Sequence, residues 1–194
     1  MIGRALFVAI AGCGLIQGSA AAQMPGFPGR VAVEVRGGMS VGNHSESAAK
    51  LDVVPKPSFD AVLNVEVIPT LSVFGGFYRT TFGCEEGFCT ERDITIVGNH
   101  GAFGAQWVPD LGLLLGPWLR AGLLVGTTRA GTLGADPETG FGYDVAAGLR
   151  LKLGRVSALP GVSYRYMQAN KPASTAYAVA LSGHIGIAIE LWGG

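Results

Sequence analysis

Residues 143–153 read Tyr-Asp-Val-Ala-Ala-Gly-Leu-Arg-Leu-Lys-Leu, which is the most regular alternation in the chain. Its odd-numbered positions are apolar, and its even-numbered positions are small or charged. Successive side chains on a β-strand point to opposite faces, so the stretch predicts a strand with one apolar and one polar face. A tilted strand needs about 9–11 residues to cross the hydrocarbon of a bilayer, which is the length found here. We therefore expect a membrane-spanning strand, with the rest of the chain supplying its neighbours.

The composition excludes several classes of protein. Charged residues make up 14% of the chain, and 14 acidic residues balance 14 basic ones, so nothing indicates nucleic acid as a partner. The body of the chain has no run of about 18 uncharged apolar residues, so no helical membrane span is expected there. A length of 194 residues fits one domain with a processed leader.

Residues 1–22 have the features of a secretory signal peptide. Arg4 provides the positive start, an apolar run follows, and three alanines precede Gln23 as a cleavage site. The alternative is a lipoprotein signal in which Cys13 is the lipidated residue. Residues 23–30, which include two prolines, are expected to form an irregular lead-in.

Stretches with the same alternation recur along residues 31–192 and define one barrel domain. The predicted strands cover residues 31–41, 58–67, 71–82, 95–108, 115–125, 143–153, 158–168 and 177–192. The predicted long loops cover residues 43–57, 82–93, 127–141 and 168–175, and tight turns join the other strands. Alternating long and short connections are typical of hairpin barrels in membranes. The sequence thus predicts an all-β fold, an eight-stranded antiparallel up-and-down transmembrane β-barrel with short periplasmic turns and longer extracellular loops.

Three features do not follow the alternation cleanly. In the third strand Phe74 and Phe77 fall on opposite faces, which leaves the phase of that strand open. In the fourth strand Asn99 falls on the apolar face, so either a β-bulge lies nearby or this residue lies beyond the lipid. Strict alternation turns Trp118 and Trp192 inward.

Alternation alone does not show which face meets lipid, because a soluble lipocalin-like barrel alternates in the same way with its apolar face inward. The polar faces here are rich in glycine, alanine and serine, and they would make a poorly soluble exterior. Their charges balance, which suits a narrow lumen where every charge needs a partner. The expected lumen charge network consists of Glu34, Arg36, Asp60, Glu66, Arg120, Asp144, Arg150, Lys152, Arg165 and Glu190.

Three sequence patterns carry a resemblance to a known family. They are Val35-Arg36-Gly37-Gly38, Pro117-Trp118-Leu119-Arg120-Ala121-Gly122 and Gly148-Leu149-Arg150-Leu151. On these residues the chain resembles the OmpA/OmpX-type eight-stranded barrels of the outer-membrane β-barrel domain family. The resemblance implies the outer membrane of a Gram-negative-type bacterium and insertion by the barrel-assembly machinery. Family members usually end on an outward-facing phenylalanine, whereas Leu191 holds the outward phase here.

Cys84 and Cys89 lie in one predicted polar loop of an exported chain, and we expect them to form a disulfide. The loop also contains Glu85, Glu86 and Glu91, so a weak cation contact is the alternative. No histidine is nearby in the sequence, which disfavours a metal site.

Ser182 and His184 lie on one strand face and are the only candidate for a catalytic pair. Lipid A deacylases, which are barrels of similar size, carry the histidine before the serine, whereas the order here is reversed. His100 and His184 come from strands on opposite sides of the barrel, so a shared metal is not expected. We expect no catalytic residue, no cofactor and no metal.

The predicted function is that of a non-enzymatic integral outer-membrane β-barrel with a structural or surface-interaction role. Its partners would be outer-membrane lipid and an unknown extracellular partner bound by the loops. The alternatives are an outer-membrane lipid-modifying enzyme, and a small pore or lipocalin-like ligand carrier. About eight strands enclose an interior that side chains just fill, so we expect no stable conductance.

Overall fold

The computed structural model describes residues 29–45, 54–84, 94–109, 111–130, 139–171 and 174–192. The predicted signal peptide at residues 1–22 and most of the predicted lead-in at residues 23–30 lie outside the described residues. The strands are β1 (Val31–Ser45), β2 (Val54–Ile68), β3 (Leu71–Cys84), β4 (Ile94–Trp107), β5 (Leu115–Ala130), β6 (Thr139–Leu153), β7 (Val156–Lys171) and β8 (Ser174–Trp192). In this part of the chain no helix is long and apolar enough to cross a bilayer.

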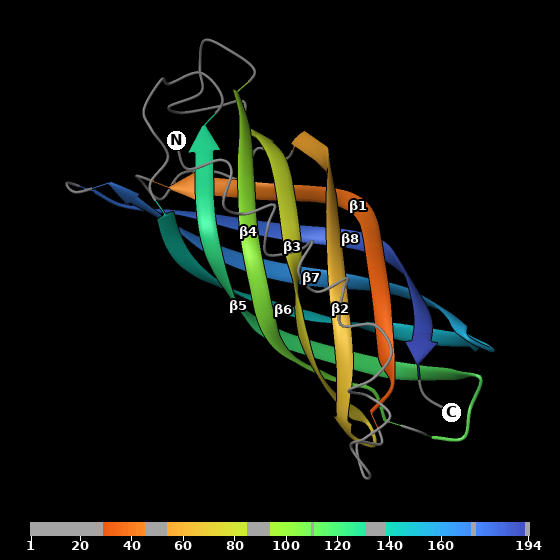
Figure 1. Cartoon of the computed structure of the whole chain (residues 1–194). Helices are drawn as coiled ribbons and strands as arrows, with labels where there is room; N and C mark the ends of the chain where they lie inside the picture. The colour runs from red at the N-terminus through yellow and green to blue at the C-terminus, as the bar shows by residue number, and fades with distance from the viewer. Residues whose placement is uncertain are drawn as a thin grey trace.

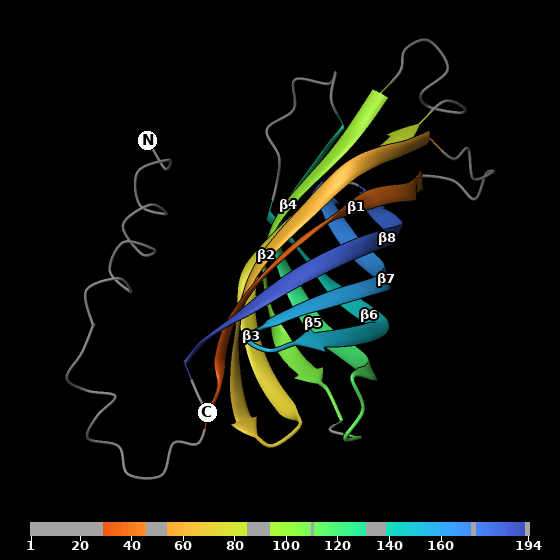
Figure 2. The same ribbon diagram turned by 90° about the vertical axis from the view of Figure 1, so that its right-hand side faces the viewer.

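The strands form one closed barrel. Each strand pairs antiparallel with the next in sequence, and β1 pairs antiparallel with β8 to close the sheet. The strands cross the barrel at a steep tilt and twist together (Figure 1), as closure requires. Figure 2 shows β2–β3 and β4–β5 joined at the lower end of the barrel, which we call the turn end, and the opposite end is called the loop end. The predicted eight-stranded antiparallel up-and-down barrel is confirmed.

The strands extend further toward the loop end than the alternation predicts, so the predicted loops 43–57, 82–93, 127–141 and 168–175 are too long. The connections left between the strands at this end are residues 46–53, 85–93, 131–138 and 172–173. The strand ends were missed because they are rich in polar residues, glycine and proline, and do not show the alternation, while backbone pairing continues through them. The fourth predicted loop loses the largest share of its length, since only two residues separate β7 from β8.

The connections at the turn end are not all tight. Residues 69–70 and 154–155 are two-residue turns, and Thr70 and Gly154 have positive φ angles of 81° and 67°. The β4–β5 connection instead runs over residues 108–114. It is tied to the neighbouring turns, because the Val108 amide donates to the Thr70 carbonyl and the Lys152 amide donates to the Leu114 carbonyl. The expected alternation of long and short connections therefore has two exceptions, the longer β4–β5 connection and the short β7–β8 connection.

The outer wall of the barrel is apolar. Val35, Leu123 and Ile185 are 54%, 55% and 64% exposed, whereas the residues that alternate with them are mostly buried in the lumen. This arrangement is the opposite of a lipocalin-like barrel, in which the apolar face is turned inward. The predicted orientation of the strand faces is the one the structure has.

The structure also resolves the irregular positions. Phe74 is buried and Phe77 is exposed, which fixes the phase of β3. The β3–β4 and β4–β5 registers run past Asn99 without a shift, so no bulge is present there. Trp118 points inward as predicted, but Trp192 is 68% exposed. The prediction for Trp192 is wrong because the β1–β8 register shifts by one residue at Leu191, and a one-residue shift reverses the faces.

Candidate functional site

The lumen is the candidate site, and its centre holds two buried ion clusters. The first is built on Glu34 of β1. Its carboxylate lies 2.5 Å from Arg36 Nε and 2.6 Å from Arg120 Nη2, and these three side chains are at most 1% exposed. Arg120 comes from β5 on the far side of the barrel, so the cluster spans the lumen.

The second cluster is built on Arg165 of β7. Its guanidinium lies 2.5 Å from Asp60 and 2.9 Å from Asp144, and it donates to the Thr80 hydroxyl at 2.7 Å. The guanidinium also stacks over the ring of Tyr78, at 4.4 Å from the ring centroid. In this cluster one basic group pairs with two acidic groups, whereas in the first cluster one acidic group pairs with two basic groups.

Neutral side chains complete the first cluster. Asn64 donates to Glu34 at 3.1 Å, and Arg120 Nε donates to Gln106 at 2.9 Å. The Arg36 guanidinium lies 5.1 Å from the ring centroid of Trp118, whose indole donates to a backbone carbonyl of β6. The centre of the barrel is therefore filled by hydrogen-bonded and stacked side chains from many strands.

An apolar layer packs in the lumen beside the ion clusters and continues toward the loop end. Its members are Val62, Phe74, Tyr78, Phe82, Ile96, Ala102, Leu124, Met167, Ala178 and Ala180. Every one of these residues is at most 5% exposed. Ion clusters and an apolar layer together obstruct the lumen along much of its length.

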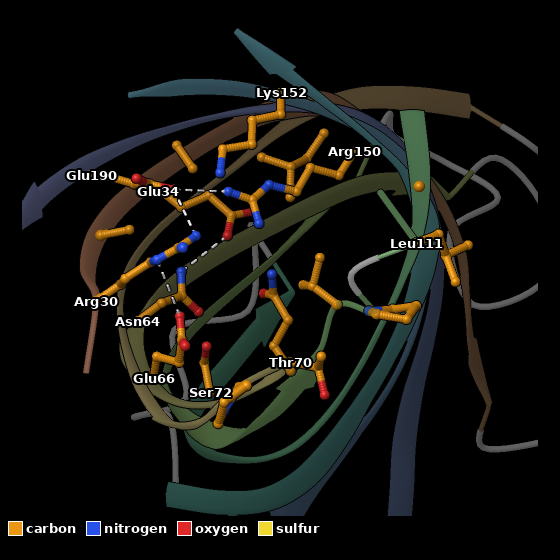
Figure 3. Close-up of a pocket in the computed structure, with 18 of the residues that line it drawn as sticks. Arg30, Glu34, Asn64, Glu66, Thr70, Ser72, Leu111, Arg150, Lys152 and Glu190 are labelled. Atoms are coloured by element: carbon orange, nitrogen blue, oxygen red, sulfur yellow. Dashed lines mark hydrogen bonds and ion pairs between the residues drawn. The ribbon is translucent and has the colours of Figure 1, made fainter. Parts of the chain in front are cut away.

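The turn end of the lumen is hollow. A cavity of about 180 Å³ opens there, and Figure 3 shows charged side chains gathered along one side of it. Arg150 lies 3.1 Å from Glu190, and Arg30 lies 3.8 Å from Glu66 and 3.9 Å from Glu190. Lys152 stands exposed at the rim and forms no ion pair with any residue that the structure describes.

Leucines of the β4–β5 connection line the other side of this cavity. Leu111, Leu113 and Leu114 all contribute to it and are between 56% and 68% exposed. In Figure 3 Leu111 lies across the opening from the charged group around Arg30. The cavity therefore has a charged side and an apolar side, and it is open rather than sealed.

The ten residues of the predicted lumen charge network do not form one network. Six of them form the two buried clusters. Glu34, Arg36 and Arg120 meet in one place, and Asp60, Asp144 and Arg165 meet in another. The four that remain lie at the turn end, where their contacts are longer and more exposed.

Sequence reasoning missed several members of these groups. Arg30 was assigned to the lead-in, yet it bridges two acidic side chains of the cavity. Asn64, Thr80 and Tyr78 were not predicted as members because they carry no charge. The inward phase of β2 would have identified Asn64. Gln106 was expected in the lumen, and it accepts a hydrogen bond from Arg120 there.

Ser182 and His184 do not form a catalytic pair in this structure. The Ser182 hydroxyl lies 2.6 Å from the Ser40 hydroxyl, which in turn donates to Ser58 at 2.7 Å. Neither ring nitrogen of His184 has a hydrogen-bond partner among the described residues. The serine is therefore engaged in a chain of hydroxyls, and the histidine does not orient it.

His100 lies on β4, away from Ser182 and His184 on β8. His100 contacts the Thr128 hydroxyl at 3.3 Å. Among the residues that the structure describes, no group of three or more histidine, cysteine, aspartate or glutamate side chains is arranged to hold a metal. Cys84 is the last residue of β3, and Cys89 lies outside the described residues, so the predicted disulfide stays a prediction.

The chain is similar in fold to solved outer-membrane barrels. Neisserial surface protein A superposes with a TM-score of 0.56 and 15% identity, covering 83% of this chain and 97% of that one. The outer membrane protein OprG from Pseudomonas aeruginosa superposes with a TM-score of 0.52 and 12% identity, covering 84% and 96%. No protein-family model matches the chain, and no curated protein matches it. The resemblance to eight-stranded outer-membrane barrels is confirmed at the level of the fold.

Proposed function

We propose that the protein is an integral outer-membrane barrel of a Gram-negative-type bacterium, that its lumen is closed to solutes, and that it acts at the cell surface through its loop end. The observation that carries this proposal is the pair of buried ion clusters across the lumen. The proposal has three parts, which are membrane insertion, a closed lumen and a role outside the barrel.

The outer wall supports membrane insertion. On β5 the outward positions from Leu115 to Val125 are all apolar or small, which matches the span of about 9–11 residues that a tilted strand needs. Exposing an apolar wall of this extent is unfavourable for a monomer in water and favourable in lipid hydrocarbon. Exposed Trp107 and Trp192 near the turn end, and stacked Tyr143, Tyr166 and Tyr177 on the same outer wall, resemble interfacial aromatic girdles.

The ion clusters support a closed lumen. A water path through the barrel would have to separate Glu34 from Arg120, or Arg165 from its two aspartates. Removing one partner of a buried pair leaves an uncompensated charge, which costs about 3–5 kcal/mol. The apolar layer of the lumen would have to open as well.

The closed lumen leaves the loop end as the working surface. The connections at residues 46–53, 85–93 and 131–138 are the sites at which we expect a surface partner to bind. We also propose that the protein is not an enzyme, and the engagement of Ser182 with Ser40 supports this.

Membrane insertion and lumen closure are tested together on the purified, refolded protein. A folded barrel in phosphatidylcholine vesicles should migrate differently on gels before and after heating. In planar bilayers the same preparation should show no stable conductance. Reproducible channels that persist after the three connections are shortened would overturn the closed lumen, and failure to enter any vesicle would overturn the membrane assignment.

A further inference from the structure

The outer wall carries very little charge, and what it carries is concentrated in one place. Among the strand side chains that the structure describes, only Arg79 of β3 and Arg129 of β5 are charged and turned outward. Both are exposed. Every acidic strand side chain in the described part of the chain is instead turned into the lumen.

The two arginines flank the same segment of β4. Arg79 pairs across the sheet with Asn99, and Asn99 pairs with Thr127 of β5. Arg129 lies two positions further along β5 and pairs with Val97 of β4. Side chains on one face of neighbouring strands lie about 4.5–5.5 Å apart, and diagonal neighbours lie somewhat further apart. We call Arg79, Asn99, Thr127 and Arg129 the outer-wall arginine patch.

The patch begins where the apolar wall ends. Arg79 follows outward-facing Phe77 on β3, and Thr127 follows outward-facing Val125 on β5. An arginine on the lipid face is strongly unfavourable at the bilayer midplane, and this cost becomes small near the interface. The position of the patch is therefore that of lipid headgroups, in the leaflet at the loop end of the barrel.

The chemistry of the patch fits a phosphate. Neither arginine forms an ion pair with a residue that the structure describes. Guanidinium groups match phosphate oxygens with parallel hydrogen bonds, and Asn99 and Thr127 add neutral donors between them. Aromatic Phe77 and Phe59, whose ring centroids lie 6.2 Å apart, lie beside the patch on the apolar wall and can contact acyl chains.

We infer that the outer-wall arginine patch binds the phosphate of a phosphorylated lipid in the leaflet at the loop end. This inference rests on the proposed membrane insertion. It assigns to three neighbouring strands, β3, β4 and β5, a lipid contact more specific than general solvation by the bilayer around the whole barrel.

The test measures lipid binding by the folded full-length barrel in detergent micelles, with native mass spectrometry of the retained lipid. The probes are a bisphosphorylated glucosamine-disaccharide lipid (lipid A) and the same lipid after removal of both phosphates. We expect the wild-type protein to retain the phosphorylated probe at least tenfold more strongly, because hydrogen bonds to charged groups are stronger than those between neutral groups. The double variant Arg79→Ala, Arg129→Ala should lose this preference.

Arg155 provides the matched control. It is an exposed basic residue in the β6–β7 turn at the opposite end of the barrel. Arg155→Ala should therefore keep the preference for the phosphorylated probe. The variant Arg79→Lys, Arg129→Lys should retain part of it, because lysine keeps the charge and loses the paired hydrogen bonds.

Three outcomes would overturn the inference. They are equal retention of both probes by the wild type, unchanged preference in the double alanine variant, and equal loss in Arg155→Ala. Insertion into phosphatidylcholine vesicles is measured separately by heat-modifiable migration, so failure of the lipid preference is distinguishable from failure of membrane insertion.

Discussion

The lumen contains two sets of ion pairs with the same chemistry and different surroundings. In the centre, Arg165 meets Asp60 and Asp144 with all three side chains at most 4% exposed. At the turn end, Arg30 and Glu66 are 3.8 Å apart and their side chains are 44% and 23% exposed. The central pairs are short and sealed, whereas those of the turn end are longer and open to solvent.

This difference shows what each set can contribute. Exposed pairs stabilise a protein by about 0–1 kcal/mol, because water and salt compete for both partners. Buried pairs add little net stability over well-packed neutral side chains, but breaking one leaves a charge with no water to solvate it. The central pairs therefore fix which strands must meet across the lumen, and the turn-end pairs leave a cavity that water can enter.

Arg165→Met should have the largest effect, because it leaves Asp60 and Asp144 buried without a cation. We expect a loss of about 3–5 kcal/mol in the free energy of unfolding, measured by urea titration in detergent micelles. Combining it with Asp60→Asn and Asp144→Asn should recover most of the loss. An unchanged midpoint for Arg165→Met would remove the distinction between the two sets of pairs.

Ser40→Ala should have an intermediate effect. The Ser40 hydroxyl joins Ser58 and Ser182 in the buried part of the lumen, and its removal leaves both with one partner fewer. We expect a loss of about 1–3 kcal/mol in the same urea titration. Ser163→Ala is the matched control, because the buried Ser163 hydroxyl has no hydrogen-bond partner among the described residues. A greater loss in the control than in Ser40→Ala would contradict the role of the hydroxyl chain.

Glu190→Gln should have a small effect that depends on salt. Glu190 pairs with Arg150 and Arg30 at the turn end, where all three side chains are partly exposed. We expect a loss of at most about 1 kcal/mol at low ionic strength, and less at 1 M salt, where the Debye length falls to about 3 Å. The loss caused by Arg165→Met should change much less with salt, and equal salt dependence of the two variants would argue against the difference in burial.

Lys152→Met should have the smallest effect. Lys152 is exposed at the rim of the cavity and makes no ion pair among the described residues. Surface substitutions of this kind usually stay within about 0.5 kcal/mol. A loss comparable to that of Glu190→Gln would mean that Lys152 belongs to the turn-end pairs after all.

Much of the barrel was accessible to sequence reasoning, because the alternation of side chains is a local property. The stretch at residues 143–153 alternates without interruption, and the structure has those faces in β6. The phase of β3 was not accessible, since Phe74 and Phe77 are equally apolar and lie on opposite faces. Because the phase of this strand was open, the sequence did not predict that Arg79 faces outward. Residues 127–141 were predicted to form a loop, so the outward position of Arg129 on a strand was not predicted either.

Two errors have a common physical cause. The predicted loops were too long, because backbone hydrogen bonding continues where side chains become polar. Trp192 was assigned inward because alternation assumes an unbroken register, and the shift at Leu191 reverses it. In both cases the neighbouring strand decides the outcome, and the neighbouring strand is not visible in a local pattern.

The fold class, the two faces of most strands and the placement of most charges in the lumen follow from the sequence. All three depend on the period-two alternation of side chains, which is visible within a single strand. Only the tertiary structure decided which charges meet. Glu34 and Arg120 lie on strands that closure brings together across the lumen, and Glu66 finds Arg30 rather than a residue of the predicted network. Such pairing depends on strand tilt, register and closure, which are properties of the whole sheet and not of any one strand.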